Sequence, residues 1–298
     1  MRVADISLSQ AITSQLDQQE SSIATLQEQI SSGRSLNKPS DDPAAVTQVL
    51  QLSSEGSQLT SWQSNAQIAT SWLGMGNNAV NSVLSNLQSA RTLLLQALNQ
   101  GTQSSTTYQA IAAQLQGINA NLLDTANTQY EGRPIFAGTS ASPQAYDSAG
   151  NYLGNGDSPT VIVGPGSGAG QAADLSVPGP VVFGTGGANV FSTLSTVIGQ
   201  LNFGTPTAAQ LNTALTALDA NISDAEQASA ELGNASDAVT STSAALTTQL
   251  TAVQNGQSSL EDVNVATVTT QLDSEMTNYQ AAMWAASQAI PETLVKFL

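Results

Sequence analysis

The side chains of this sequence that could carry out chemistry are almost all carboxylates. His and Cys are both absent, which removes the commonest general base, the thiol nucleophile and two of the usual metal ligands. The remaining catalytic option is a carboxylate pair among Asp147, Asp157 and Asp174, which would have to meet in a cleft. We therefore predict that the protein is not an enzyme, and we expect no catalytic, cofactor-binding or metal-binding residues.

Two further segments have the composition of ligand sites but not the spacing. Asp147, Asn151, Asn155 and Asp157 could serve as calcium ligands, yet their order is not that of an EF-hand, and turns use Asn and Asp for backbone reasons. Residues 164–170 alternate glycine with small residues, but no helix with a Lys-Ser/Thr pair follows, as a phosphate-binding loop requires. Turns and a flexible loop are the simpler interpretation.

The charge balance excludes two classes of partner. Only 6 Lys and Arg stand against 22 Asp and Glu, giving a formal net charge of -16, which nucleic acid and anionic membranes would repel. No apolar run approaches the roughly 18 residues of a membrane span, and residues 1–10 lack the pattern of a secretory signal peptide. We therefore expect no nucleic acid partner, no membrane insertion and, if the protein is exported, no cleaved signal.

Both ends of the chain carry apolar residues at heptad spacing. Steps of three and four residues keep one narrow stripe on one side of a helix, as in a coiled-coil seam. A helix with such a stripe is marginal in water by itself, so each end should pair with the other end or with neighbouring copies. The ladders are Leu8, Ile12, Leu16, Gln19, Ile23, Leu26 and Ile30, and Val265, Val268, Leu272, Met276, Tyr279, Met283, Ala286 and Ile290. We predict that they form the subunit interface, through all of these residues except Gln19, Val265 and Ala286.

The fold class predicted from the periodicity is mainly α with a small β-rich insert. We expect an elongated molecule, in which the N- and C-terminal halves form a long antiparallel helical bundle or coiled coil around an outward β domain. The expected parts are a coiled-coil segment and turn at 1–42, a helical rod at 43–131 and 205–258, the insert at 132–204, and a coiled-coil helix at 259–298.

Local signals mark the ends of the rod helices. Asp42 and Pro43 predict the start of a long helix that ends near residue 98, with a break near Gly74 and Gly76. A second helix is expected from about residue 106. Thr207 and Gln210 have capping-box spacing and predict a helix that continues nearly to residue 256.

Short β-branched runs predict the strands of the insert. We expect strands at residues 161–163 and 181–183, and two short strands around a turn within residues 145–157. Because the insert is rich in glycine and poor in charge, we also expect that residues 140–203 can be replaced by a linker without loss of the rest of the fold.

One segment between the first ladder and the rod concentrates charge and proline in a chain that is poor in both. The run SGRSLNKPSDDPAAV, residues 32–46, resembles the signature that follows the N-terminal helix in the flagellin family. LEDVNVAT, residues 260–267, resembles the matching C-terminal signature. TQYEGRPIFAGT and AYDSAGNYLGNGD are more similar to the members that join hook and filament than to flagellin itself. The residues that we call the signature turn are Arg34, Asn37, Lys38, Asp41, Asp42 and Pro43.

This resemblance implies a structural part of the bacterial flagellum, extracellular and exported unfolded by the flagellar type III apparatus. It implies an adaptor between hook-associated protein 1 and the flagellin filament, with neighbouring copies and an export chaperone as further partners and no cofactor. The family's terminal helices pair as a coiled coil on assembly, and we expect Arg34 and Lys38 to reduce repulsion between copies. Flagellin itself is the nearest alternative, and a surface adhesin or tail-fibre-like assembly protein is a more distant one.

Overall fold

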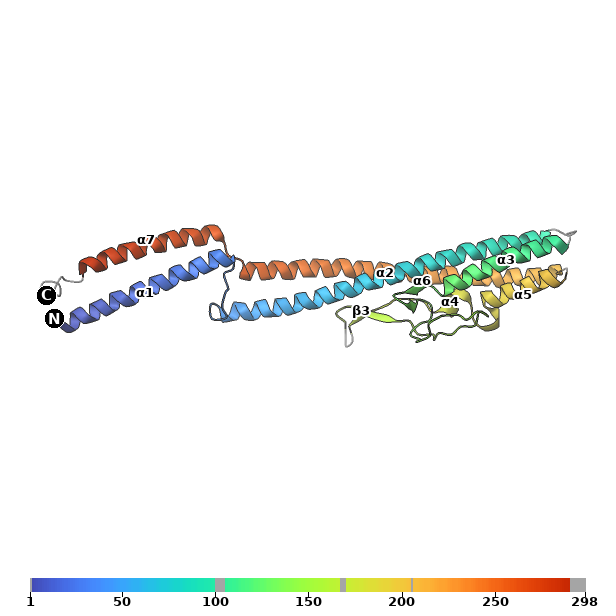
Figure 1. The fold of residues 1–298 in the computed structure, drawn as a ribbon, viewed down its shortest axis with the longest axis horizontal. Coiled ribbons are helices and arrows are strands. Elements are labelled where there is room, and N and C mark those ends of the chain that lie inside the picture. The colour runs from blue at the N-terminus through green and yellow to red at the C-terminus, as the bar shows by residue number, and fades with distance from the viewer. Residues whose placement is uncertain (1, 100–104, 167–169, 205, 290–298) are drawn as a thin grey trace. The chain divides into compact units, whose positions relative to one another are not determined.

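The computed structural model describes residues 2–99, 105–166, 170–204 and 206–289 of the 298-residue chain. The chain divides into two compact units, residues 1–58 with 249–298 and residues 59–248. The predicted class, mainly α with a small β-containing part, is confirmed (Figure 1). None of the described helices is long and apolar enough to span a membrane. In chain order the elements are α1 (Arg2–Ser32), α2 (Pro43–Asn99), α3 (Ser105–Ala126), β1 (Gln129–Tyr130), β2 (Arg133–Pro134), β3 (Thr160–Gly164), β4 (Gln171–Asp174), α4 (Gly179–Phe183), the 3-10 turn η1 (Gly186–Ala188), α5 (Val190–Phe203), α6 (Ala208–Glu261) and α7 (Val265–Ala289).

The starts of the two long helices are fixed by the caps that the sequence predicts. The Oδ1 atom of Asp42 accepts hydrogen bonds from the N–H groups of Ala44 and Ala45, both at 3.0 Å, where α2 begins at Pro43. At α6, Gln210 Oε1 accepts from the Thr207 N–H at 2.9 Å, and the Gln210 N–H donates to Thr207 Oγ1 at 3.3 Å. This reciprocal pair is a capping box.

The predicted break in α2 is wrong, because the helix continues through Gly74 and Gly76. Glycine costs a helix about 1 kcal/mol relative to alanine. Burial of the neighbouring Leu73 and Val80, both at 0% exposure, outweighs that cost.

Contacts between α2 and α6 show that the two helices run antiparallel in each unit. In the second unit, Gln63 Nε2 donates to Thr247 Oγ1 at 3.2 Å, and Arg91 Nε lies 2.7 Å from Asp219 Oδ1. Residue numbers rise along α2 as they fall along α6. In the first unit, Gly256 lies beside Leu52 and Gly56 lies beside Val253, so the order is the same.

The sheets are smaller than the composition of the insert suggests. β1 pairs with β2 and β3 pairs with β4, each as an antiparallel two-stranded ladder. The strand predicted at 161–163 is confirmed within β3. The two strands predicted around 145–157 are reduced to an isolated bridge between Tyr146 and Tyr152, closed by a turn in which the Gly150 N–H donates to the Asp147 carbonyl at 3.0 Å.

The predicted strand at 181–183 is wrong, since these residues form the helical turn α4. Pro180 lies in its first turn, where the fixed φ of proline suits a helix start. Helix α5 was also missed by the β-rich interpretation of the insert. Asn189 caps α5 by accepting a hydrogen bond from the Ser192 N–H at 2.8 Å, and its apolar residues recur at helical spacing.

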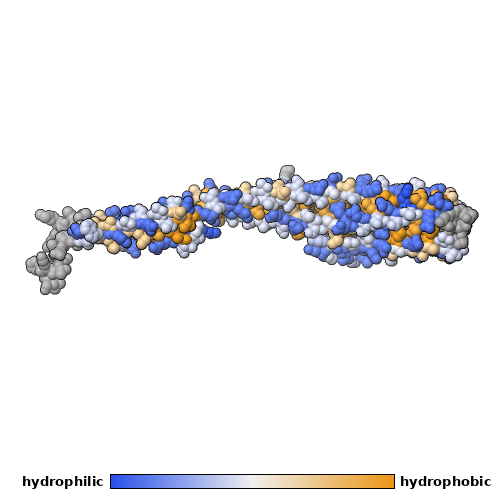
Figure 2. Space-filling model, turned by 90° about the horizontal axis from the view of Figure 1, so that it is seen from above, coloured by the Kyte–Doolittle hydropathy of each residue, from blue (hydrophilic) through white to orange (hydrophobic). Residues whose placement is uncertain are grey.

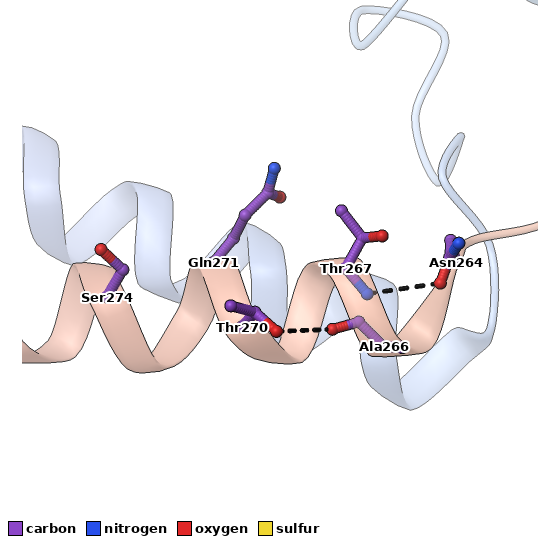
Figure 3. A pocket seen from close by; sticks show the side chains of 6 residues that line it. All are labelled: Asn264, Ala266, Thr267, Thr270, Gln271 and Ser274. Atoms are coloured by element: carbon purple, nitrogen blue, oxygen red, sulfur yellow. Dashed lines mark hydrogen bonds between the residues drawn. The ribbon is translucent and has the colours of Figure 1, made fainter.

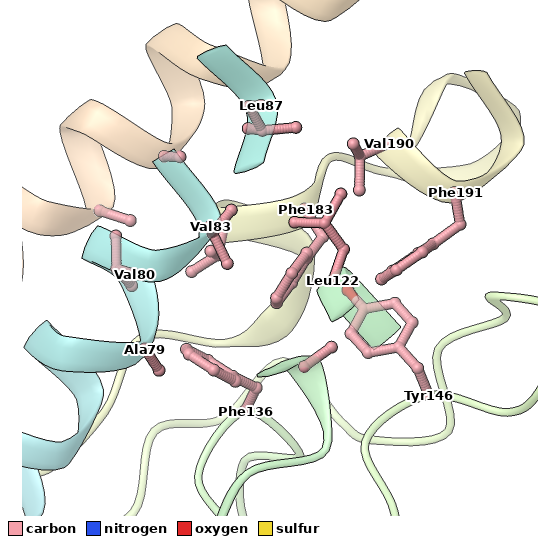
Figure 4. Close-up of a cluster of buried hydrophobic side chains, with 14 of the residues drawn as sticks. Ala79, Val80, Val83, Leu87, Leu122, Phe136, Tyr146, Phe183, Val190 and Phe191 are labelled. Atoms are coloured by element: carbon pink, nitrogen blue, oxygen red, sulfur yellow. The ribbon is translucent and has the colours of Figure 1, made fainter. Parts of the chain in front are cut away.

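The insert shares one hydrophobic core with the helices around it. Four aromatic side chains gather at its centre, with ring centroids 5.0 to 5.5 Å apart in the contacting pairs (Figure 4). Buried residues of α2 and α3 continue the same cluster. The residues involved include Val80, Val83 and Leu87 of α2, Leu122 of α3, and Phe136, Tyr146, Phe183 and Phe191. The insert therefore contributes buried side chains to the core of the second unit.

Candidate assembly interface

The N-terminal ladder forms one side of a helix pair in the first unit. Helices α1 and α7 contact each other along their lengths (Figure 1). In α1 every described ladder residue is half-buried, whereas the residues between them are mostly exposed. Gln19 occupies the same stripe, and its Oε1 atom is buried with no hydrogen-bond partner. The half-buried ladder residues are Ile12, Leu16, Gln19, Ile23, Leu26 and Ile30. The side chains of Leu8 and Ile290 lie outside the described residues.

The ladder of α7 separates into two stripes. One stripe contains the buried Val268 and Ala286 and the half-buried Leu272 and Tyr279. It repeats at heptad spacing, as expected of the seam with α1.

The other stripe of α7 is open to solvent. Val265, Met276 and Met283 are exposed by 50%, 41% and 47%, and Trp284 beside them by 68%. The first three recur after eleven and seven residues, close to whole helical turns, so they line one face. We call these four residues the outer stripe. Apolar residues also reach the surface among hydrophilic ones on the face seen in Figure 2.

The signature turn joins the two points at which the helices are interrupted. Arg34 forms an antiparallel bridge with Asp262, in the break between α6 and α7. The Ser35 N–H donates to the Glu261 carbonyl at 2.7 Å, and the Val263 N–H donates to the Gly33 carbonyl at 3.1 Å. Glycine suits position 33 because its φ of 71° is in the left-handed region. The N- and C-terminal signatures thus form one backbone clamp.

Side chains of the signature turn hold its own backbone. Asp41 Oδ2 accepts hydrogen bonds from the N–H groups of Asn37 at 3.1 Å and Lys38 at 2.8 Å. With Asp42 capping α2 immediately afterwards, both aspartates have local structural roles.

Both cations of the signature turn are paired within the chain. Lys38 Nζ lies 2.9 Å from Glu28 Oε2, and this carboxylate raises the pKa of Lys38. Arg34 Nη2 lies 3.6 Å from Glu261 Oε2. Because all four side chains keep substantial exposure, each pair contributes little to stability. These ion pairs give Arg34 and Lys38 a role within one chain, in addition to the role between copies that the sequence predicts.

A shallow groove lies on the polar face of α7, next to the clamp (Figure 3). No charged side chain lines it. Asn264 Oδ1 accepts from the Thr267 N–H at 3.3 Å and so caps the helix, and Thr270 Oγ1 donates back to the Ala266 carbonyl at 2.9 Å. These side chains serve the helix itself. The lining residues are Asn264, Ala266, Thr267, Thr270, Gln271 and Ser274.

Two of the three carboxylates considered for chemistry have local hydrogen-bond partners. Asp147 Oδ1 accepts hydrogen bonds from the N–H groups of Ala149 at 2.9 Å and Asn151 at 2.8 Å, and donors from Asn151 lower the pKa of Asp147. Asp157 Oδ2 accepts from Asn155 Nδ2 at 3.1 Å. The turn interpretation of this segment is confirmed. Across the described ranges, no three acidic side chains come together in a group that could hold a metal ion.

Two family models match the parts of the chain that contain these features. The bacterial flagellin N-terminal helical region matches residues 3–141, and the bacterial flagellin C-terminal helical region matches residues 215–298. The chain belongs to the flagellin family. The two matched regions include both ladders and both halves of the clamp.

The chain is also similar to individual proteins with a flagellar name. The chain is 34% identical to flagellar hook-associated protein 3 of Salmonella typhimurium over 137 residues, which is 45% of this chain and 43% of that protein. The match thus spans less than half of that relative.

Solved structures share the fold. A Vibrio parahaemolyticus protein described as a flagellar hook-associated protein aligns with a TM-score of 0.68 and 23% identity, over 74% of this chain and 100% of that chain. The flagellar junction protein FlgL of Legionella pneumophila aligns with a TM-score of 0.58 and 14% identity, over 72% and 100%. At these identities the likeness concerns the fold alone.

Proposed function

We propose that this member of the flagellin family is the adaptor that joins the hook-associated protein 1 ring to the flagellin filament. The observation that carries the proposal is the outer stripe, an apolar face left open on a helix that is already paired within its own chain. The similarity to hook-associated protein 3 supports the junction, rather than the filament, as the place of assembly.

The packing of the first unit supports assembly through the terminal helices. The α1–α7 seam is only half-buried for most of its length, so one pair by itself gains modest stability from burial. A neighbouring copy that covered Val265, Met276 and Met283 would remove three further apolar side chains from water. Burial between subunits would therefore further stabilise the helix pair.

We further infer an extracellular location, reached by export in an unfolded state, with a chaperone before export. The outer stripe supports the chaperone, because an exposed apolar face at high concentration promotes nonspecific association. No catalytic residue or cofactor is assigned to this function.

Flagellin itself remains the second candidate, since both flagellin models match this chain. The two candidates differ in copy number and position. Immunogold labelling of purified hook–filament complexes tests this difference, with flagellin labelled in parallel as the control. We expect label at one point between hook and filament. Label along the whole filament would assign the chain as a filament subunit.

A further inference from the structure

The hairpin formed by β1 and β2 holds the side chain of Arg133 against the aromatic ring of Trp72. Tyr130 pairs with Arg133 across a two-residue turn, Glu131 and Gly132, with φ values of 49° and 78°. Positive φ at both central residues is the geometry of a type I′ turn, and a glutamate rarely occupies it. The Arg133 guanidinium lies 5.9 Å from the centroid of the Trp72 ring, and that ring packs against Tyr130 at 5.2 Å.

Arg133 differs from the other Arg and Lys residues whose side chains the structure describes in having no carboxylate partner. Arg34, Lys38 and Arg91 each form an ion pair within the chain. Within the ranges that the structure describes, no acidic oxygen lies within 4.0 Å of the Arg133 side chain, which is exposed. Stacking on Trp72 orders the guanidinium and leaves its N–H groups directed to solvent or to a partner.

The complementary charges lie on α6 at the same level of the second unit. Trp72 lies between Gln63, which contacts Thr247, and Gly76, which contacts Leu232. Asp237 and Glu231 are therefore near the height of Arg133. Both are exposed, but Gln227 Nε2 donates to Glu231 Oε1 at 3.1 Å, and Glu231 lies on a different side of α6 because it is six residues from Asp237. Asp237 has no ion-pair partner among the described residues.

We propose that Arg133 joins two copies of this chain side by side, through an ion pair with Asp237 of the next copy. The inference rests on the proposed function. In a ring, equivalent residues of neighbouring copies lie at the same level, and each head-to-tail contact joins two different patches. In a chain of net charge -16, an ordered arginine opposite a carboxylate that has no ion pair of its own also offsets repulsion between copies. The partner is thus a second copy.

Charge exchange in the full-length protein tests the contact. Arg133→Glu should reduce the amount of the protein found in purified hook–filament complexes by about tenfold, because like charges then face each other. Combining it with Asp237→Arg should restore incorporation, whereas combining it with Glu231→Arg should not. Arg91→Glu is the matched control, since it makes the same charge change at a cation already paired with Asp219 in its own chain. Thermal melts of the free proteins should show that Arg133→Glu remains folded.

Normal incorporation of Arg133→Glu, or failure of Asp237→Arg to restore it, would overturn the contact. A chemical measurement gives an independent result, because the chain has no cysteine. Cysteines introduced at 133 and 237 should be joined between copies by a short bismaleimide in assembled complexes, whereas cysteines at 133 and 213 should not. Absence of the first product would also reject the contact. Labelling of the wild-type protein away from the junction would instead reject the proposed function.

Discussion

Two tyrosines of the aromatic cluster differ in whether the hydroxyl group has a hydrogen-bond partner. The rings of Tyr146 and Tyr152 lie 5.2 Å apart. The Tyr152 hydroxyl is 2.6 Å from the Asn155 carbonyl and 3.0 Å from the Phe136 carbonyl, but the Tyr146 hydroxyl is buried without a partner. Burial accordingly raises the pKa of Tyr146 far above its ordinary value.

This difference predicts that the same substitution, Tyr to Phe, has different effects on the free energy of unfolding at the two positions. Tyr152→Phe should lower the free energy of unfolding by about 1 kcal/mol, because it removes the hydroxyl that donates to the Asn155 carbonyl. Tyr146→Phe should leave it unchanged or raise it by up to about 1 kcal/mol, because it removes a desolvated group that has no partner. Urea unfolding of the two variants measures both values. Equal destabilisation would mean that the Tyr146 hydroxyl has a partner in solution.

Asp147 predicts a pH dependence at the same scale. Hydrogen bonds from Asn151 favour the ionised carboxylate and hold the pKa of Asp147 below its ordinary value of 3.8. Because the pKa of Asp147 is lower in the folded state than in the unfolded state, ionisation of this carboxylate stabilises the folded state. The stabilising contribution is present above the unfolded pKa and disappears as the pH falls through the folded pKa. Carboxyl NMR titration should show the low midpoint, and Asn151→Ala should move it back toward 3.8. A midpoint insensitive to that change would assign the shift to another cause.

At the scale of elements, α7 carries two faces with different tasks. Leu272 lies in the seam with α1, whereas Met283 lies in the outer stripe. Leu272→Asp should reduce the helical signal of the free protein and also its incorporation, because a carboxylate in a desolvated seam costs several kcal/mol. Met283→Asp should leave the free protein's circular dichroism unchanged and impair incorporation alone.

Gln271→Asp is the control for this comparison, because Gln271 is an exposed residue on the polar face of the same helix. It should incorporate normally and melt as the wild type does. If Met283→Asp incorporated equally well, the outer stripe would not be a contact surface.

At the scale of the whole molecule, the hydrophobic core lies mainly in residues 59–248. This unit contains the aromatic cluster and the packed faces of α2, α3, α5 and α6. Produced alone, residues 59–248 should melt cooperatively but should not enter hook–filament complexes, because they lack the α1–α7 pair. Circular dichroism and a pull-down on purified complexes measure the two properties. A non-cooperative melt would show that the unit depends on the terminal helices.

The same core corrects one expectation from the sequence. Replacement of residues 140–203 by a linker would remove Tyr146, Phe183, Phe191 and all of α5. It would expose the faces of α2 and α3 that these residues cover. Low charge and abundant glycine suggested an independent outer domain, but composition does not report which side chains share a core.

The sequence by itself determined the features that depend on neighbours along the chain. Heptad spacing placed the half-buried stripe of α1, and the capping residues Asp42, Thr207 and Gln210 placed the starts of α2 and α6. Such signals are local, because hydrogen bonds within a helix join residues three or four positions apart. The sequence motifs of the two ends likewise indicated the flagellin family.

Only the tertiary structure decided the features that depend on distant residues. It separated the α7 ladder into a seam and an outer stripe, because the position of α1 determines which apolar residues are covered. It paired Arg34 and Lys38 within the chain and, in the part of the chain that it describes, left Arg133 without a carboxylate partner. It also placed 181–183 in a helix, since a short β-branched run takes its conformation from the core that it enters. Burial and ion pairing depend on residues that are distant in the sequence, whereas spacing along the chain describes only one of the two surfaces that meet in each contact.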